Sequence, residues 1–191
     1  MIGPTKSKLP QALDARTRRT RASLDRTLLT LLGHKPFERI TIREIARRAG
    51  IGYATFFRHY SGKESLLNAV AAHQIRDLLA QALPILFAAN SRAACRSLCV
   101  FVDRRRRLWR ALLTGGAAAI MRAEFVRQAR AIAAQRPGPR GWLPDDLKVV
   151  YGVGGTIDVL AWWLQQRRAL PAARIARVLD RLVITPVLSK S

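Results

Sequence analysis

Residues 41–63 constrain the fold of this chain more than any other segment, because they have the pattern of two short helices, a tight turn and the start of a third helix. Thr41 and Glu44 have the spacing of a capping box, in which each side chain satisfies the other residue's backbone amide. Gly50 ends the first helix, since glycine adopts a left-handed backbone without steric strain. Two helices joined in this way form a helix-turn-helix, which places its second helix in the major groove of DNA.

Apolar residues at helical spacing support the same segment. The first helix has one apolar face, made by Ile42, Ile45, Ala46 and Ala49. We expect the second helix over residues 52–60, with three side chains directed inward: Ile51, Phe56 and Tyr60. Ser61 and Glu64 form a second capping box, which opens the third helix.

At these residues the chain resembles the N-terminal domain of the tetracycline-repressor (TetR) family of bacterial transcription regulators. The family motifs are a threonine cap, Ile-Ala-x-x-Ala-Gly, aromatic-x-His-aromatic and Ser-x-Lys-Glu-x-Leu. In this chain they stand at Thr41, residues 45–50, residues 57–60 and residues 61–66. They cover about a quarter of the chain. The resemblance is specific, because spacing, turn and caps agree together.

The resemblance implies a DNA-binding domain over residues 15–62, whose first helix covers residues 16–37. The inward face of that helix is made of leucines: Leu24, Leu28, Leu31 and Leu32. The residues implied for DNA contact are Thr41, Arg43, Arg47, Gly52, Tyr53, Ala54, Thr55, Phe57, Arg58, His59 and Lys63.

Two of these residues depart from the family pattern. Phe57 stands where the family usually has a tyrosine that donates to a phosphate, so that hydrogen bond is not implied here. Tyr53 stands where a small polar or basic residue is common, so the base preference of other members does not carry over.

The remainder of the chain has helical patterns and no strand pattern. We therefore expect an all-α protein, with a three-helix DNA-binding domain and a larger helical domain over residues 63–191. The helices of the larger domain are expected at residues 64–82, 85–89, 91–104, 105–113 and 117–135, with the first ended near Pro84. Residues 136–144 are dense in proline and glycine and predict a loop. A long helix follows to about residue 168, capped by Asp145 or Asp146, and Pro171 opens the last helix.

The resemblance also implies the roles of the larger domain. In this family that domain commonly holds an effector among its helices, and its last two helices pair with a second subunit. The candidate ligand-binding residues are aromatic or sulfur-containing, with one carboxylate: Trp109, Met121, Phe125, Tyr151, Asp158 and Trp162. The candidate dimer interface combines a helix thinned by glycine with apolar residues of the last helix: Gly155, Trp163, Leu179, Leu182 and Val183.

Several of these residues have a second interpretation. Aromatic side chains at helical spacing also form ordinary core, and glycines also allow close packing within one chain. Asp158 can orient a polar ligand or pair with an arginine across a dimer. Cys95, Cys99 and Asp103 lie on one helix face and, with His73, define an alternative thiol or metal sensor. Their spacing lacks the Cys-x-x-Cys pattern of a metal site, so no metal is expected.

The net charge favours an anionic partner, since the chain of 191 residues has a formal charge of +22. The excess is not confined to the helix-turn-helix: residues 1–62 have 13 Lys/Arg against 4 Asp/Glu, and residues 63–191 have 21 against 8. A GC-rich genome would give the same excess of basic residues without selection for DNA binding. Arginine outnumbers lysine 28 to 6, as such a genome would produce. Residues 1–14 lack periodicity and are expected to be a disordered basic arm, which either tracks phosphates or stays in solution.

Three classes of function follow for comparison. A dimeric, ligand-responsive regulator of a palindromic operator, most simply a repressor, accounts for the motif, the helices and the charge together. A non-specific nucleic-acid or nucleoid protein accounts only for the charge. An enzyme is not indicated, because the sequence lacks a glycine-rich phosphate loop and a nucleophile elbow, and no cofactor is expected. No signal peptide or membrane span is recognised, so the chain is expected in the cytoplasm, without a membrane partner.

Overall fold

The computed structural model describes residues 9–87, 90–135, 143–168 and 170–189. Over these residues the chain is helical and has no strand, which confirms the all-α expectation. The α-helices are α1 (Leu9–Leu32), α2 (Ile42–Ala49), α3 (Tyr53–Phe57), α4 (Lys63–Phe87), α5 (Ser91–Arg104), α6 (Arg106–Leu113), α7 (Ala118–Gln135), α8 (Asp145–Gln165), α9 (Ala172–Leu179) and α10 (Thr185–Leu188). Two 3-10 turns, η1 (Phe37–Arg39) and η2 (Gly115–Ala117), precede α2 and α7, and a π-helical turn, η3 (Asp180–Ile184), joins α9 to α10.

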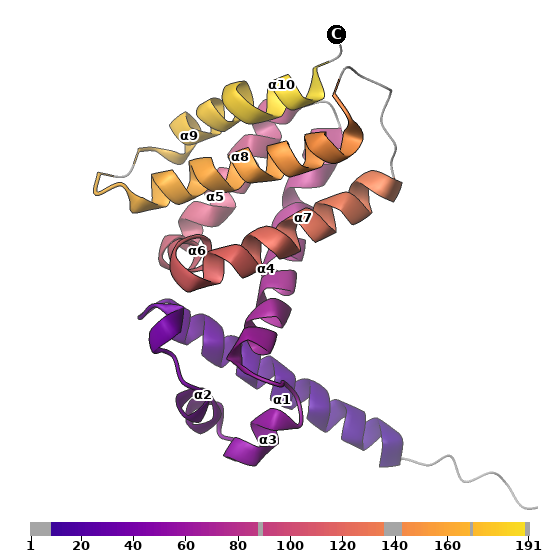
Figure 1. Cartoon of the computed structure of the whole chain (residues 1–191), viewed down its shortest axis with the longest axis vertical. Helices are drawn as coiled ribbons and strands as arrows, with labels where there is room; N and C mark the ends of the chain where they lie inside the picture. Colours follow the sequence, from indigo (N-terminus) through magenta and orange to yellow (C-terminus); the bar gives the residue numbers. More distant parts are fainter. Residues whose placement is uncertain (1–8, 88–89, 136–142, 169, 190–191) are drawn as a thin grey trace, which may run out of the picture.

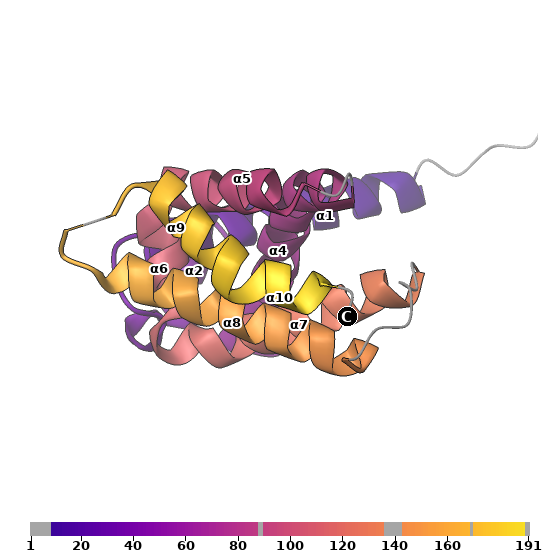
Figure 2. The ribbon, with the colours of Figure 1, turned by 90° about the horizontal axis from the view of Figure 1, so that it is seen from above.

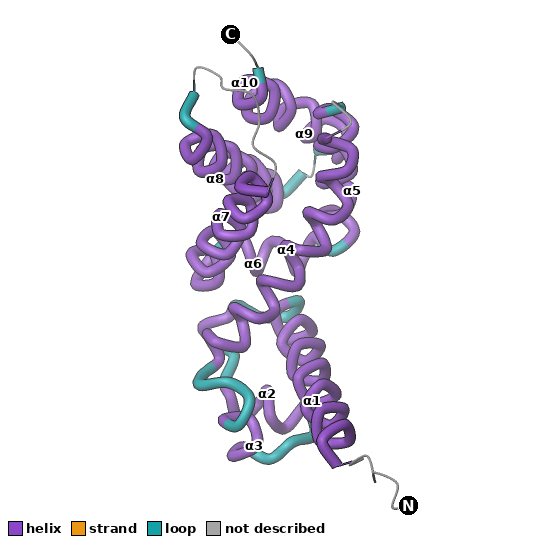
Figure 3. Tube along the Cα trace, turned by 90° about the vertical axis from the view of Figure 1, so that its right-hand side faces the viewer, coloured by secondary structure: helices purple, strands orange, loops and turns teal. Residues whose placement is uncertain are grey.

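The helix-turn-helix lies at one end of an elongated molecule (Figure 1). This end, which we call the head, consists of α1, α2, α3 and the first turns of α4 (Figure 3). Its core confirms the inward face expected for α1, since four leucines are buried there: Leu24, Leu28, Leu31 and Leu32. Side chains from the other helices of the head complete the cluster: Ile45, Phe56, Leu66 and Leu67. The helix-turn-helix is therefore fixed to α1 and α4 by apolar packing.

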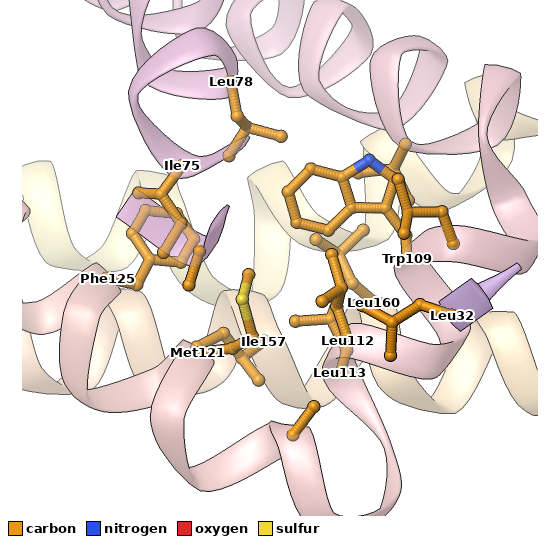
Figure 4. Close-up of a cluster of buried hydrophobic side chains, with 14 of the residues drawn as sticks. Leu32, Ile75, Leu78, Trp109, Leu112, Leu113, Met121, Phe125, Ile157 and Leu160 are labelled. Carbon is orange, nitrogen blue, oxygen red and sulfur yellow. The ribbon is translucent and has the colours of Figure 1, made fainter. Parts of the chain in front are cut away.

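The other end, which we call the body, surrounds the remaining length of α4. α7 packs on α4 and α8, while α5 packs on α4 and α9 (Figure 2). The centre of the body is a cluster of apolar side chains from α4, α6, α7 and α8, with Trp109 and Met121 among them (Figure 4). Trp163 of α8 is also fully buried. One apolar core thus joins the helices of the body.

α1 differs from the expectation at both ends. Residues 9–14 are helical, so the expectation of a disordered arm is wrong for them, and residues 1–8 lie outside the described residues. Pro10 is compatible with the helix, because an amide in the first turn has no helical partner in any case. The helix ends at Leu32 and not at residue 37. Pro36 explains this, since a proline drives the residue before it out of helical geometry.

α4 is one continuous helix, whereas the sequence predicted an end near Pro84 and a new helix at residue 85. A proline inside a helix removes one backbone hydrogen bond and disfavours the helix by about 3 kcal/mol. Leu78, Leu79 and Ala82 are buried in the turns just before it. Packing of these side chains in the body therefore outweighs the loss at Pro84.

α8 differs from the expectation that no segment of the chain is long and apolar enough to span a membrane. Its length and apolar composition alone would suffice to cross a membrane, and it is the one helix in the described part of the chain for which this holds. The same property is found in core helices of soluble proteins. One side of α8 is indeed buried in the body, through residues such as Val153, Ile157 and Leu160.

Candidate nucleic-acid interface and ligand cavity

The turn of the helix-turn-helix has the geometry that its residues predict. Thr41 is extended, and its hydroxyl accepts from the Glu44 amide at 3.2 Å. Gly50 is left-handed, with φ 69° and ψ 32°, and its amide donates back into the last turn of α2. The Glu44 carboxylate pairs with the Lys35 ammonium, and this hydrogen bond lowers the pKa of Glu44. The capping box is therefore closed on its threonine side, while its carboxylate anchors the end of the α1 segment.

α3 presents two aromatic rings on its open side. Tyr53 is 52% exposed and Phe57 is 46% exposed, and their rings meet edge to face with centroids 5.2 Å apart. Phe56 is fully buried and fixes the opposite side of α3 to the core of the head. The helix ends at Phe57 and not at Tyr60 as expected, because the backbone tightens there: the His59 amide donates to the Phe56 carbonyl group, three residues back.

Most of the other side chains predicted for DNA contact are accessible on the head. The exposed residues are Thr41, Arg43, Arg47, Gly52, Ala54 and Arg58, and Thr55 and His59 are half-buried. The Arg58 guanidinium donates to the Thr55 hydroxyl at 3.1 Å. Burial, together with nearby Arg21 and Arg58, lowers the pKa of His59, so its imidazole is neutral at neutral pH. A neutral imidazole donates one hydrogen bond and adds no charge at a phosphate.

Lys63 has a different environment from the one expected for a phosphate ligand. Its ammonium donates to the carbonyl groups of Phe37, Glu38 and Ile40, at 3.2, 3.3 and 3.0 Å. It also lies 4.7 Å from the centre of the Phe37 ring. An ammonium has three protons, and all three have acceptors within the head. The side chain of Lys63 therefore ties the start of α4 to the loop before α2.

A polar cluster that the sequence did not reveal joins α1 to α4. Asp25 accepts from the Tyr60 hydroxyl at 3.4 Å and lies 3.3 Å from Nδ1 of His73. Burial raises the pKa of the Asp25 carboxyl, and the nearby His73 opposes that shift. Burial and the Asp25 charge also raise the pKa of Tyr60 to about 12, so its hydroxyl keeps its proton. These contacts bring together residues 35 or more positions apart, which no local pattern indicates.

The body contains an apolar cavity of about 190 Å³ at the end remote from the head. It lies between α4, α5, α7, α8 and the C-terminal helices, and its lining residues are Leu79, Ala82, Leu83, Leu86, Ala94, Cys95, Leu98, Phe125, Ala129, Lys148, Val149, Gly152, Val153, Thr156, Leu179, Ile184, Val187 and Leu188. The Thr156 hydroxyl donates to the Gly152 carbonyl group at 2.7 Å, and the Lys148 ammonium donates to Asp145 at 2.9 Å. Both polar side chains of the lining are therefore already paired.

Phe125 is the one predicted ligand-binding residue in this lining. Trp109 and Met121 are fully buried in the core, which agrees with their second interpretation (Figure 4). The assignment of Tyr151, Asp158 and Trp162 to a cavity is wrong, because all three are exposed on the opposite side of α8. Asp158 pairs with Arg122 of the same chain, at the surface. The cavity exists where small residues of several helices face each other, among them Ala82, Ala94, Ala129 and Gly152.

The candidate interface residues also divide into two groups. Trp163, Leu179 and Val183 are buried within the chain, so they are wrong as accessible interface residues. Gly155 allows close packing within the chain, since a Cβ there would lie 3.0 Å from the Val183 side chain. Leu182 alone of the five is exposed, at 59%.

Large exposed apolar side chains are concentrated in two places. In the described part of the chain they lie either on α3 or on the helices from α8 to α10: Tyr53, Phe57, Leu147, Val150, Tyr151, Trp162, Val178, Leu182 and Leu188. Leu147, Tyr151, Asp158 and Trp162 follow one another at helical spacing along α8. We call the residues Leu147, Tyr151, Trp162, Val178 and Leu182 the α8–α9 face.

The cysteine pair has the properties of core residues. Cys95 and Cys99 are free and buried, and burial raises the pKa of each thiol to about 12. A thiol in this state is a poor nucleophile and a poor metal ligand at neutral pH. His73 contacts Asp25, and no group of three metal-ligating side chains is found among the residues described.

Comparison with known proteins identifies the head. Residues 27–70 match the model of the bacterial regulatory proteins of the tetR family. The uncharacterized HTH-type transcriptional regulator YxbF of Bacillus subtilis (strain 168) is 32% identical over 77 residues, which are 40% of this chain and 20% of that protein. This match thus spans about a fifth of the relative's length.

Solved structures share the fold over most of the chain. The TetR transcriptional regulator from Streptococcus agalactiae 2603V matches with a TM-score of 0.66 and 18% identity, over 91% of this chain and 98% of that chain. AibR in complex with isovaleryl coenzyme A and operator DNA matches with a TM-score of 0.55 and 22% identity, over 86% and 97%.

Fold and head together define a helix-turn-helix protein with a helical C-terminal body. Within that class, residues 27–70 match the tetR-family model, and the fold of the chain is similar to that of solved TetR regulators. The resemblance found in the sequence is thereby confirmed.

Proposed function

We propose that this protein is a dimeric, sequence-specific transcription regulator that leaves a palindromic operator when a small apolar ligand binds in the body. Repression is its simplest mode of action. One observation carries the proposal: the same chain has a solvent-exposed candidate recognition helix, α3, and an apolar cavity, and α4 connects them. AibR, a protein of the same fold, binds both operator DNA and isovaleryl coenzyme A. The proposed domains are residues 15–62 for DNA binding and residues 63–191 for the ligand and the dimer.

α3 enters the major groove in this proposal. The first residues of a recognition helix reach base edges, and here these are Tyr53, Ala54 and Thr55. The exposed rings of Tyr53 and Phe57 favour apolar contact with thymine methyl groups. Lys63 takes part through the backbone amides at the start of α4, since its ammonium is engaged within the head.

Phosphate binding by the head uses arginine in this proposal. Arg43, Arg47 and Arg58 are exposed around the turn, and the Thr41 and Gly52 positions lie at the starts of α2 and α3. Each phosphate neutralised releases condensed counterions, so binding weakens as salt rises.

A second copy of the chain covers the α8–α9 face in this proposal. Several large apolar side chains of α8 and α9 are exposed, as is typical of an interaction site, and the two rings of Tyr151 and Trp162 are the type of anchor that interfaces favour. A two-fold dimer carries two heads and therefore suits two half-sites about 34–36 Å apart. This requirement argues for a second copy and against an unrelated partner.

The ligand is an uncharged, mainly apolar compound in this proposal. The Thr156 and Lys148 side chains are already paired, so the cavity offers apolar contacts and no free charge. An apolar cavity of about 150 Å³ is enough to bind benzene. A cavity of about 190 Å³ therefore suits a compound with one ring or a similar branched chain.

Two other interpretations are weighed against this proposal. A non-specific nucleic-acid protein would also use the net charge of +22, but it would not need the exposed rings of α3 or a cavity. A thiol sensor is disfavoured, because the raised pKa of Cys95 and Cys99 leaves their thiols protonated. A regulator of chromosomal operators acts in the cytoplasm, which we propose as its location.

Replacement of Tyr53 or Thr55 by alanine tests sequence-specific binding. Each change is expected to reduce the difference in binding free energy between operator and non-specific DNA by about 1–3 kcal/mol, which corresponds to the loss of one base contact. The wild-type protein first selects its operator from random duplex DNA, and fluorescence anisotropy at one salt concentration then gives both affinities. Thr30→Ala, on the exposed side of α1, is the matched control. If the selection yields no palindromic sequence, the interpretation as a non-specific nucleic-acid protein replaces this proposal.

Ala129→Phe tests the cavity. Ala129 lines it from α7 and is only half-buried, so a phenyl ring enters the ligand's space without displacing the core. We expect operator affinity to stay within about twofold, and release by apolar compounds to need at least about tenfold more compound. The measurement titrates the operator complex with a panel of one-ring and branched compounds. Ala123→Phe, on the exposed side of the same helix, is expected to respond like wild type. Equal responses in the two variants would place the ligand elsewhere.

A further inference from the structure

One loop of the head is held from two sides, by the first residue of α4 and by η2, the turn before α7. The loop is η1 with Ile40, and it leads directly into the Thr41 cap of α2. Lys63, at the start of α4, holds its backbone, and Gly116, in the turn before α7, holds the side chain of Glu38. The position of α2 therefore depends on both α4 and α7.

Glu38 makes the contact with η2, the turn before α7, through its carboxylate. Its Oε1 accepts from the Gly116 amide at 2.5 Å, across 78 positions of sequence. Amides in the first turn of a helix lack helical partners, and the positive end of the helix dipole favours a carboxylate there. Hydrogen bonds from its own amide and from Gly116 lower the pKa of Glu38, which keeps the carboxylate charged. Glu38 thus caps η2, which leads directly into α7, from another part of the chain.

Gly116 has to be glycine for this contact. A Cβ at that position would overlap the Glu38 carboxylate, with the carboxyl carbon only 3.1 Å away. Its φ is not in the left-handed region, unlike that of Gly115 at 71°. Alanine therefore suits the backbone at 116 and conflicts only with Glu38. Gly116→Ala therefore breaks the contact between Glu38 and Gly116 while the charge of Glu38 is kept.

α4 and α7 both run from this loop to the cavity. Lys63 is the first residue of α4 and Gly116 lies in η2, just before α7, while Leu79 of α4 and Ala129 of α7 line the cavity. The two helices also pack against each other. A ligand that changes their spacing at the cavity changes the relative positions of Lys63 and Gly116 at the loop.

We infer that Glu38 is a positioning residue for operator binding, which fixes the orientation of the head relative to α7 through the Gly116 amide. The inference rests on the proposed function and adds the route by which the body acts on the head. With the Glu38–Gly116 contact broken, the head is held to the body by α4 and α1 and turns more freely. Two heads must match two half-sites at once, so this freedom lowers specific affinity and leaves non-specific affinity unchanged.

The test is a double-mutant cycle in the full-length protein, with Glu38→Ala, Gly116→Ala and both changes together. Operator selected by the wild-type protein and a scrambled duplex of the same length are titrated with each variant. Each single variant is expected to lose about tenfold in operator affinity, the order of one charge-assisted hydrogen bond. The scrambled duplex is expected to bind Gly116→Ala as tightly as wild type. In the Glu38→Ala background, Gly116→Ala is expected to have no further effect, because the carboxylate it displaces is gone.

Hydrogen exchange at the Gly116 amide supplies a second readout that a purely structural role would not move. Operator binding is expected to slow this exchange in the wild-type protein and to leave it unchanged in Glu38→Ala, by linkage between the two sites. Circular dichroism and thermal unfolding confirm that each variant is folded. Asp77→Asn, an exposed carboxylate on α4, controls for the loss of one negative charge.

The outcomes separate this inference from the proposed function. A wild-type protein without a preferred operator would overturn the proposed function and this inference with it. A wild-type protein that binds its operator, with both single variants binding equally well, would overturn the inference alone. Additive losses in the double variant would also overturn it, because they would show that Glu38 and Gly116 act separately.

Discussion

Leu182→Arg is expected to convert the proposed dimer to monomers and to lower operator affinity by at least about 100-fold. Leu182 is 59% exposed on the turn after α9, in the α8–α9 face. An arginine there places a charge in an apolar interface without a partner, which opposes association. Two linked heads exceed one head in affinity by about 10²–10⁴, and a monomer loses that advantage. Sedimentation velocity gives the mass, and anisotropy with the selected operator gives the affinity.

Ala173→Arg is the matched control for this change. Ala173 is exposed on α9 and lies outside the α8–α9 face, so the same charge is expected to leave both mass and affinity unchanged. A Leu182→Arg protein that sediments as a dimer would contradict the assignment of the interface to this face.

Trp163→Ala is expected to destabilise the fold by about 3–5 kcal/mol. Trp163 is fully buried, and its indole N–H donates to the Leu170 carbonyl group at 2.8 Å. The Arg106 guanidinium lies 4.7 Å from the centre of its ring and donates to its carbonyl group. Truncation to alanine leaves a cavity, removes the donor from the Leu170 carbonyl group and removes the aromatic ring that Arg106 contacts. Urea unfolding measures the change, in a Leu182→Arg background that keeps dimerisation out of the equilibrium.

Trp162→Ala provides the contrast, because the two tryptophans are neighbours in sequence. Trp162 is 50% exposed, so its removal from the monomer is expected to change stability by less than about 1 kcal/mol. In the wild-type background the same change is expected to weaken the dimer. Equal losses of monomer stability for the two variants would contradict the orientation of α8.

The head could be predicted from the sequence because its signals are local. Thr41 and Gly50 define the start and the end of α2 by spacing alone, and the structure has the expected cap and left-handed turn. The leucines of α1 repeat at helical spacing and are buried as expected. The environment of Lys63 could not be predicted from local spacing, because the three carbonyl groups that accept from its ammonium lie 23 to 26 positions earlier in the chain.

The body was harder to predict because α8 is apolar on both sides. Periodicity separates two faces of this helix, but it does not say which face is buried in the monomer. The pattern therefore predicts a cavity position for Tyr151 and Trp162, which are exposed, and a surface position for Trp163, which is buried. The cavity itself depends on small residues of different helices, such as Ala94 and Gly152, meeting in space. No single helix carries that information.

The contact between Glu38 and Gly116 also bears on how such proteins are recombined. A chimera that joins residues 1–62 to the effector domain of another regulator keeps the covalent junction at α4. It loses the Gly116 amide unless the new domain offers a glycine at the same place before its own α7 counterpart. A biosensor built in this way would inherit the DNA preference of the head without the non-covalent restraint on its orientation. Transplanting η2 together with the head is the corresponding design rule.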